Sequence, residues 1–303
     1  MKPARRRWII AALVAIGAGF AVRFGWTFPW TQTLDTLADA DWALLGAAGL
    51  MNIVSLMAKG SAWHLLLRRL APLRAGTAQA ATFVGAAVNS VSVSVSGEAA
   101  RAQMANRRDG VPFTLAVGSL VVSRVVEAIG LVVFLALAFI LLPPWAGART
   151  IGFILGGVAV AVMLGYHLVL GKRPLPALSR ISRFARGGLF GPVALATLSW
   201  VAQWFTYHWS IVATHTTITP AASLSALVLA NLAGILRLTP GNIGVMQGSL
   251  VLGMQAFRIP AANALAAGLA LQAVQVLPIL AIGLAIGGAR SFRFLAARRA
   301  GAV

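Results

Sequence analysis

Long apolar segments recur along this sequence and constrain its fold more than any other feature. A helix needs about 20 apolar residues to cross a bilayer, and six segments come near that length: 8–24, 42–58, 113–142, 150–170, 189–213 and 260–288. Only 10% of the residues are charged, against about 25% in soluble domains. The sequence therefore predicts an all-α, polytopic membrane protein. No polar stretch approaches the roughly 50 residues of a small soluble domain, so we expect one transmembrane domain over residues 1–303.

Two further stretches, 77–108 and 221–257, are apolar but interrupted. The first contains VNSVSVSVSGEAARA, and the second contains LRLTPGNIGVMQGS. Broken helices leave backbone groups unpaired in lipid, so they are tolerated only where protein or a cavity surrounds them. We therefore predict about six crossing helices and two re-entrant hairpins.

Basic residues predict the orientation, because cytoplasmic loops are enriched in lysine and arginine. They cluster before the first span, in the loop after the second span beginning at Lys59, and in the tail 290–303. Two re-entrant hairpins place these clusters on one side. We expect a multi-pass protein of the bacterial cytoplasmic (inner) membrane, with both termini and the basic tail in the cytoplasm.

The net charge of +19 does not indicate nucleic-acid binding. The basic residues lie between apolar segments, and no helix-turn-helix or aromatic-basic platform is present. They fit topology signals and contacts to anionic lipid headgroups. The chain has no cysteine, and its four histidines show no metal-ligand spacing. We expect no metal and no cofactor.

A weak internal repeat relates the two halves of the chain. A shift of 148 residues aligns Val111-Pro112 with Ile259-Pro260, Arg124 with Gln272, and Glu127 with Gln275. The predicted halves, 1–148 and 149–290, each hold three crossings and one hairpin. An odd number of crossings inverts one half relative to the other, which is a transporter signature with the binding site at the repeat interface.

Both glutamates of the chain, Glu98 and Glu127, have an arginine three residues away, which is a spacing that allows intrahelical pairs. We expect Glu98 to pair with Arg101, and Arg124 with Glu127. Ionisable residues at membrane depth cost about 2.5–3.5 kcal/mol each, so they face protein or water. Two interpretations stay open, a structural ion pair and an anion site in which the arginines bind and the glutamates are charge partners.

The second broken stretch offers another candidate site. Pro240 stops a helix and Gly241 permits a sharp turn, so a helix restarting at Asn242 would direct free N–H groups at an anion. Neighbouring glutamines can line a polar groove or join helices. The candidate substrate-binding residues are Arg101, Arg124, Arg237, Gly241, Asn242, Gly244, Gln247 and Gln272.

These motifs resemble those of the lysylphosphatidylglycerol synthase transmembrane family. GEAARAQMANRRDGVPFTLAVGSLVVSRVVEA is similar to its G-E-x-x-R … R-x-x-[ED] region, and LRLTPGNIGVMQG to its R-x-x-P-G-x-x-G-x-x-[EQ] region. The matching positions are Gly97, Glu98, Arg101, Arg124, Glu127, Arg237, Pro240, Gly241, Gly244 and Gln247. The family includes the flippase half of the multiple peptide resistance factors, but this chain has no room for their soluble aminoacyltransferase domain. Position 247 is Gln where the family often has an acid, which argues against proton coupling there.

Three functions remain to be compared. We expect a flippase-like lipid translocase that binds an anionic or phosphate-bearing headgroup on an aminoacyl-phospholipid, a phospholipid or a polyprenyl-phosphate glycolipid. One alternative is an accessory scaffold of an envelope lipid or glycolipid pathway, and another is an intramembrane headgroup transferase. The sequence favours a non-enzyme, because an arginine beside each glutamate makes it a poor general base. The expected partners are membrane lipids, with a homo-oligomer or an envelope-biosynthesis partner left open.

Overall fold

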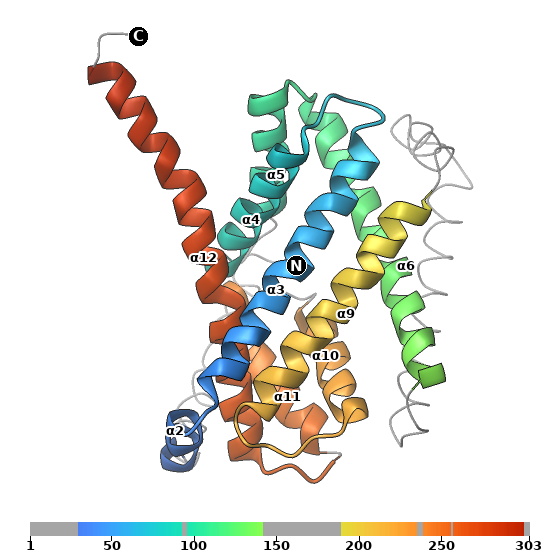
Figure 1. Ribbon diagram of the computed structural model, residues 1–303, viewed down its shortest axis with the longest axis vertical. Coiled ribbons are helices and arrows are strands. Elements are labelled where there is room, and N and C mark those ends of the chain that lie inside the picture. The colour runs from blue at the N-terminus through green and yellow to red at the C-terminus, as the bar shows by residue number, and fades with distance from the viewer. Residues whose placement is uncertain (1–29, 93–95, 142–188, 235–238, 256, 300–303) are drawn as a thin grey trace, which may run out of the picture.

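A computed structural model describes residues 30–92, 96–141, 189–234, 239–255 and 257–299, and within these ranges the regular elements are all helical (Figure 1). This confirms the predicted all-α fold. The predicted spans 8–24 and 150–170 lie outside the described residues. The elements are α2 (Trp30–Ala38), α3 (Trp42–Leu67), α4 (Ala75–Val91), α5 (Ser96–Asp109), α6 (Phe113–Leu141), α9 (Phe190–Val212), α10 (Pro220–Gly234), η1 (Pro240–Asn242), α11 (Val245–Gln255) and α12 (Ala261–Arg299).

Three of the described helices contain segments long and apolar enough to cross a membrane: Trp42–Leu67, Phe113–Ala138 and Ala261–Gly287. They coincide with three predicted spans, although the predicted end of the span 42–58 is wrong. Helix α3 continues to Leu67, so Lys59 lies inside a helix and not in the loop where the sequence had placed it. Helix α12 continues to Arg299, so the predicted tail begins inside this helix.

The two interrupted stretches fold as helical hairpins. Helices α4 and α5 form the first, and α10 and α11 form the second, with η1 at its turn. Figure 1 shows the first pair in the upper half of the molecule and the second pair in the lower half. Close packing in the first pair needs glycine, because a Cβ on Gly85 would lie 2.7 Å from the Gly97 carbonyl oxygen. Their re-entrant placement in a bilayer stays a prediction.

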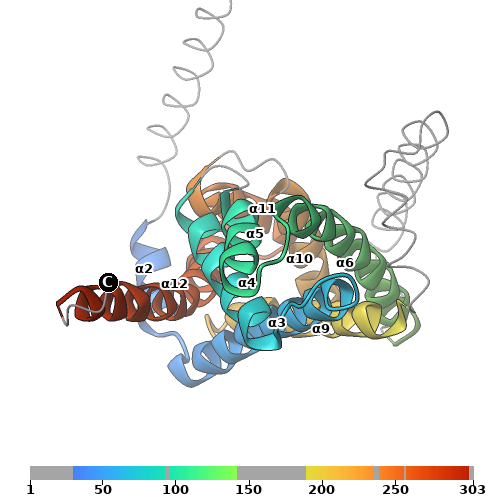
Figure 2. The ribbon, with the colours of Figure 1, turned by 90° about the horizontal axis from the view of Figure 1, so that it is seen from above.

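Helices α3 and α9 pack against each other along one side of the bundle. They run in opposite directions in Figure 1, and Figure 2 places them between α6 and α12. Polar side chains join them in their buried interface. The Ser55 hydroxyl lies 2.9 Å from the Ser199 hydroxyl and donates to Gln203 Oε1 at 3.1 Å. Ser55 and Gln203 are 148 residues apart, so the shift found in the sequence maps one onto the other.

The same shift relates the starts of whole helices. Helix α3 begins at Trp42 and α9 at Phe190, while α6 begins at Phe113 and α12 at Ala261. Each pair of starts is separated by the 148 residues that separate Ser55 from Gln203. Helix α6 runs downward in Figure 1 and α12 runs upward. The halves 1–148 and 149–290 stay a prediction, which these spacings support.

Contacts between the halves also occur in related pairs. Asn52 Nδ2 donates to the Gln275 carbonyl at 3.2 Å, and Trp200 Nε1 donates to the Glu127 carbonyl at 2.8 Å. The 148-residue shift maps the donor Asn52 onto the donor Trp200, and the acceptor Glu127 onto the acceptor Gln275. A two-fold relation between two copies of one unit gives such paired contacts.

A carboxylate at the end of α5 ties it to the start of α4, and so joins the two ends of the first hairpin. Asp109 accepts hydrogen bonds from the Arg74 backbone and Arg74 Nε, both at 2.8 Å, and from the Thr77 hydroxyl at 3.1 Å. Burial alone would raise the pKa of Asp109, but these hydrogen bonds outweigh it and lower the pKa below its ordinary value.

We predict that Asp109→Asn lowers the free energy of unfolding at pH 7 by about 1–3 kcal/mol, because it removes a charged acceptor. Since the folded-state pKa is lowered, the stabilisation is present above the ordinary pKa of about 4 and is lost as the pH falls through the folded-state value. Thermal unfolding in detergent at pH 7 and at pH 3 measures both effects. Asp35→Asn at an exposed position is the control, and an equal loss in both variants would contradict the assignment.

Candidate functional site

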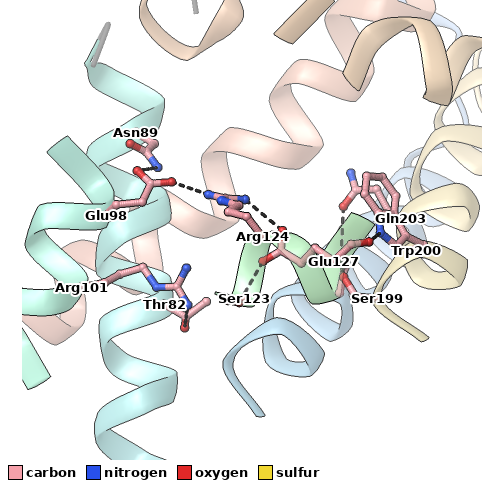
Figure 3. A network of polar contacts seen from close by, with 11 residues as sticks. Thr82, Asn89, Glu98, Arg101, Ser123, Arg124, Glu127, Ser199, Trp200 and Gln203 are labelled. Carbon is pink, nitrogen blue, oxygen red and sulfur yellow. Dashed lines mark hydrogen bonds and ion pairs between the residues drawn. The ribbon is translucent and has the colours of Figure 1, made fainter. Parts of the chain in front are cut away.

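One arginine joins the first hairpin to α6. The guanidinium of Arg124 donates from Nη1 to Glu127 at 2.9 Å and from Nη2 to Glu98, as Figure 3 shows. The predicted pair of Arg124 with Glu127 is present, but the predicted pair of Glu98 with Arg101 is wrong. Helix α5 packs against α6, and this packing brings Glu98 to an arginine 26 residues away in sequence.

Both carboxylates have further hydrogen-bond donors. Asn89 Nδ2 donates to Glu98 at 3.3 Å, and the Ser123 hydroxyl donates to Glu127 at 3.3 Å. The side chain of Arg124 is half-exposed, whereas those of Glu98 and Glu127 are 19% and 11% exposed. Each glutamate is therefore held by an arginine and a neutral donor, as the charge-partner interpretation requires.

Arg101 has an unusual environment for a buried cation. It is only 7% exposed, and its guanidinium carbon lies 4.7 Å from the centre of the Trp63 ring. Its Nη2 donates to the Thr82 hydroxyl at 3.3 Å, while its Nε is buried without a hydrogen-bond partner. The ion pairs formed among the described residues do not include it. An arginine has five N–H donors, so Arg101 retains donors for an anion.

Lys59 is a member of this cluster that the sequence analysis missed. Its Nζ lies 5.5 Å from the centre of the Trp200 ring, and it interacts electrostatically with Glu127, as do Arg124 and Arg101. Trp200 also donates to the Glu127 backbone. The available signal was the apolar run SAWHLLL after Lys59, which extends the helix beyond the lysine and places the charge inside the span.

The turn of the second hairpin departs from the prediction. Helix α11 begins at Val245 and not at Asn242, because Gly241, Asn242 and Gly244 all have positive φ angles of 60°, 56° and 83°. The Gly244 N–H donates to Gln247 Oε1 at 2.7 Å. The structure thus brings two predicted anion-binding residues together and occupies Gln247 Oε1, while Gln247 Nε2 is buried without a hydrogen-bond partner among the described residues.

The last turn of α4 meets the turn of the second hairpin. A Cβ on Gly241 would lie 2.6 Å from the Ser90 carbonyl oxygen, and Gln272 Nε2 donates to the Gly241 carbonyl at 3.0 Å. Beside this contact lies a cavity of about 150 Å³, lined by Asn89, Ser92, Gly234, Thr239, Gly241 and Asn242. Asn89 links the cavity to Glu98, so the two predicted groups of site residues are neighbours.

Two further predictions concern Arg237 and the binding of a metal ion. Arg237 lies outside the described residues. Among the described residues, no group of three or more His, Cys, Asp or Glu side chains is placed to hold a metal ion. The arrangement can bind an anion through cationic and neutral donors, while both carboxylates are already engaged.

The fold and this charge cluster define a helical membrane protein with paired ionisable side chains between its helices. The chain matches the family described as "Lysylphosphatidylglycerol synthase TM region" over residues 8–283, and it therefore belongs to that family. A curated relative is "Glycosyltransferase AglD" of Haloferax volcanii, which is 25% identical over 328 aligned positions. The match covers 89% of this chain and 52% of the relative, so the chain spans about half of that protein's length.

Buried Arg101 and half-exposed Arg124 predict different stabilities on substitution. Arg101→Met keeps an apolar side chain against Trp63 and leaves no carboxylate without its partner, so we expect it to change the free energy of unfolding by less than about 1 kcal/mol. Arg124→Met leaves Glu98 and Glu127 without their shared cation, and we expect a loss of about 1–3 kcal/mol, reduced by the half-exposure of Arg124. Thermal unfolding in one detergent compares them. A larger loss for Arg101→Met would show that Arg101 is the structural residue.

Proposed function

We propose that this protein binds the phosphate-bearing headgroup of a membrane lipid and moves that lipid across the bilayer. Membership of the family and a relative described as a glycosyltransferase support a role in a membrane lipid or glycolipid pathway. The observation that carries the proposal is Arg101, a buried cation whose Nε has no hydrogen-bond partner among the described residues.

The energetics of burial favour a ligand for Arg101. Removing a cation from water costs several kcal/mol unless an opposite charge and hydrogen bonds compensate it. The Trp63 ring and the Thr82 hydroxyl supply only part of that compensation. A phosphate oxygen supplies both charge and acceptors, and arginine is well suited to phosphate because its planar fork matches two oxygens.

Translocation is supported by the relation between the halves. Inverted repeats with broken helices place a binding site near the membrane midplane, and rocking of one half against the other gives alternating access. The paired contacts of Asn52 and Trp200 with opposite halves are consistent with such a relation. Gly241 and Asn242 at the cavity are then headgroup contacts, while Gly244 and Gln247 hold the turn in shape.

The length of the relative favours a second candidate function. Because that glycosyltransferase is about twice as long as its matched segment, this chain can also act as the membrane partner of a separate enzyme. As an accessory scaffold it would move no lipid alone, and it would co-purify with an enzyme of the same pathway. No described contact favours the transferase alternative, since Arg124 occupies both carboxylates.

Lipid translocation in proteoliposomes tests the proposal. We expect the protein to move at least one of labelled phosphatidylglycerol, lysyl-phosphatidylglycerol, phosphatidylethanolamine and polyprenyl phosphate. Arg101→Met should reduce the rate at least about tenfold, because a lost charge-assisted hydrogen bond corresponds to roughly 1.5–3 kcal/mol. Arg107→Met, at an exposed position of the same helix, should retain the rate.

The controls separate folding from binding. Both variants should elute from size exclusion as the unsubstituted protein does. Normal transport by folded Arg101→Met would remove the central observation of the proposal, and no movement of any lipid by the unsubstituted protein would favour the scaffold function.

A further inference from the structure

Contacts with two neighbouring helices set the position of the Arg101 side chain. A Cβ on Gly85 of α4 would lie 2.5 Å from Arg101 Cγ, so the glycine leaves room for the stem of the arginine. The stem leads the guanidinium to the Trp63 ring of α3 and the Thr82 hydroxyl of α4. Ring and hydroxyl are both neutral, and the ion pairs formed among the described residues do not include Arg101.

The Trp63 ring under this guanidinium is held firmly. It is fully buried, and its Nε1 donates to the Ser119 hydroxyl of α6 at 2.9 Å. That hydroxyl donates in turn to the Ala116 carbonyl at 2.7 Å. Arginine has a long side chain with many rotamers, so the guanidinium of Arg101 can change partners while the ring stays in place.

Glu98 is a carboxylate that can compete for Arg101. Residues three apart on a helix are neighbours, and Glu98 precedes Arg101 by three positions in α5. In the structure Glu98 contacts Arg124 of α6 instead (Figure 3). Asn89 gives Glu98 a neutral hydrogen bond at 3.3 Å, and a charge-assisted hydrogen bond is about twice as strong as a neutral one. Without Arg124, we therefore expect Glu98 to turn to Arg101.

We propose that Arg124 is a positioning residue, which keeps Arg101 open for the phosphate of the ligand by occupying Glu98. The inference rests on the proposed binding of a phosphate-bearing lipid by Arg101. A phosphate oxygen and the Glu98 carboxylate are both anionic acceptors for the same guanidinium. An Arg101 that is paired with Glu98 binds phosphate only after that pair breaks, so Arg124 acts on affinity through Glu98 and Arg101 without contacting the ligand.

Binding of phosphatidylglycerol to the detergent-solubilised full chain tests this role, with diacylglycerol of the same acyl chains as the phosphate-free control. Thermal stabilisation at increasing lipid concentration gives both affinities. Arg124→Met should weaken binding of phosphatidylglycerol at least about tenfold, because the pair of Glu98 with Arg101 has to break. Binding of diacylglycerol should be unchanged, and Arg107→Met at an exposed position of α5 should leave both affinities unchanged. An unaltered affinity of Arg124→Met for phosphatidylglycerol, or an equal loss for both lipids, would overturn the inference.

A double-mutant cycle tests whether Glu98 is the intermediary. In a Glu98→Gln background, Arg124→Met should weaken binding less than about twofold, because the competing carboxylate is gone. Glu127→Gln is the matched background, since Glu127 is the other carboxylate that contacts Arg124 but lies on α6. There the full effect of Arg124→Met should persist. A full effect in both backgrounds would show that Arg124 contacts the ligand itself, and the positioning role would be wrong.

Two further variants complete the series. If Arg124→Met does not fold, Arg124→Gln replaces it in each background with the same expected results, because a neutral amide cannot neutralise Glu98. Arg101→Met separates the inference from its premise. Weak binding by Arg101→Met together with normal binding by Arg124→Met would uphold the proposed function and reject the inference. Normal binding by folded Arg101→Met would reject both.

Discussion

The bridge from Arg124 to Glu98 and Glu127 is the interaction on which the arrangement of the site depends. It joins α5 to α6 within an apolar bundle. Three ionisable groups cost least free energy in such a surrounding when they contact one another. Because Arg124 occupies both carboxylates, Arg101 is left with a tryptophan ring and a hydroxyl as its main contacts. The proposed roles, structural for Arg124 and ligand-binding for Arg101, follow from this one bridge.

Much of the fold could be predicted, because apolar length and interruption are local properties of the sequence. The stretch 77–108 reads as two helices around a polar break, and the structure has α4 and α5 there. The ion pairing could not be predicted, because a spacing of three residues shows which side chains can meet within one helix and not which helix packs beside it. Lys59 was misplaced because one charge in an apolar run resembles the end of a span. Asn242 was misplaced because three positive φ angles extend the turn to Val245.

The two proposed halves have related hydrogen bonds but different side chains. Asn52 and Trp200 occupy related positions and make related hydrogen bonds across the bundle, although an amide and an indole have little in common as side chains. Both side chains donate a hydrogen bond to a backbone carbonyl of the opposite proposed half. This explains why similarity between the proposed halves is faint in the sequence and clearer in the contacts.

The hydrogen bond between Ser55 and Gln203 has a consequence for the history of the chain. These two residues are each other's counterparts under the 148-residue shift. If the proposed halves arose by duplication of a gene, the ancestor was a homodimer of oppositely inserted copies, and a residue in this position faced its own copy across the two-fold axis. Two identical side chains on an axis must be able to pair with themselves, as hydroxyl or amide groups do and charged groups do not. Divergence from such a self-pairing position would leave two different polar residues in contact, as Ser55 and Gln203 are.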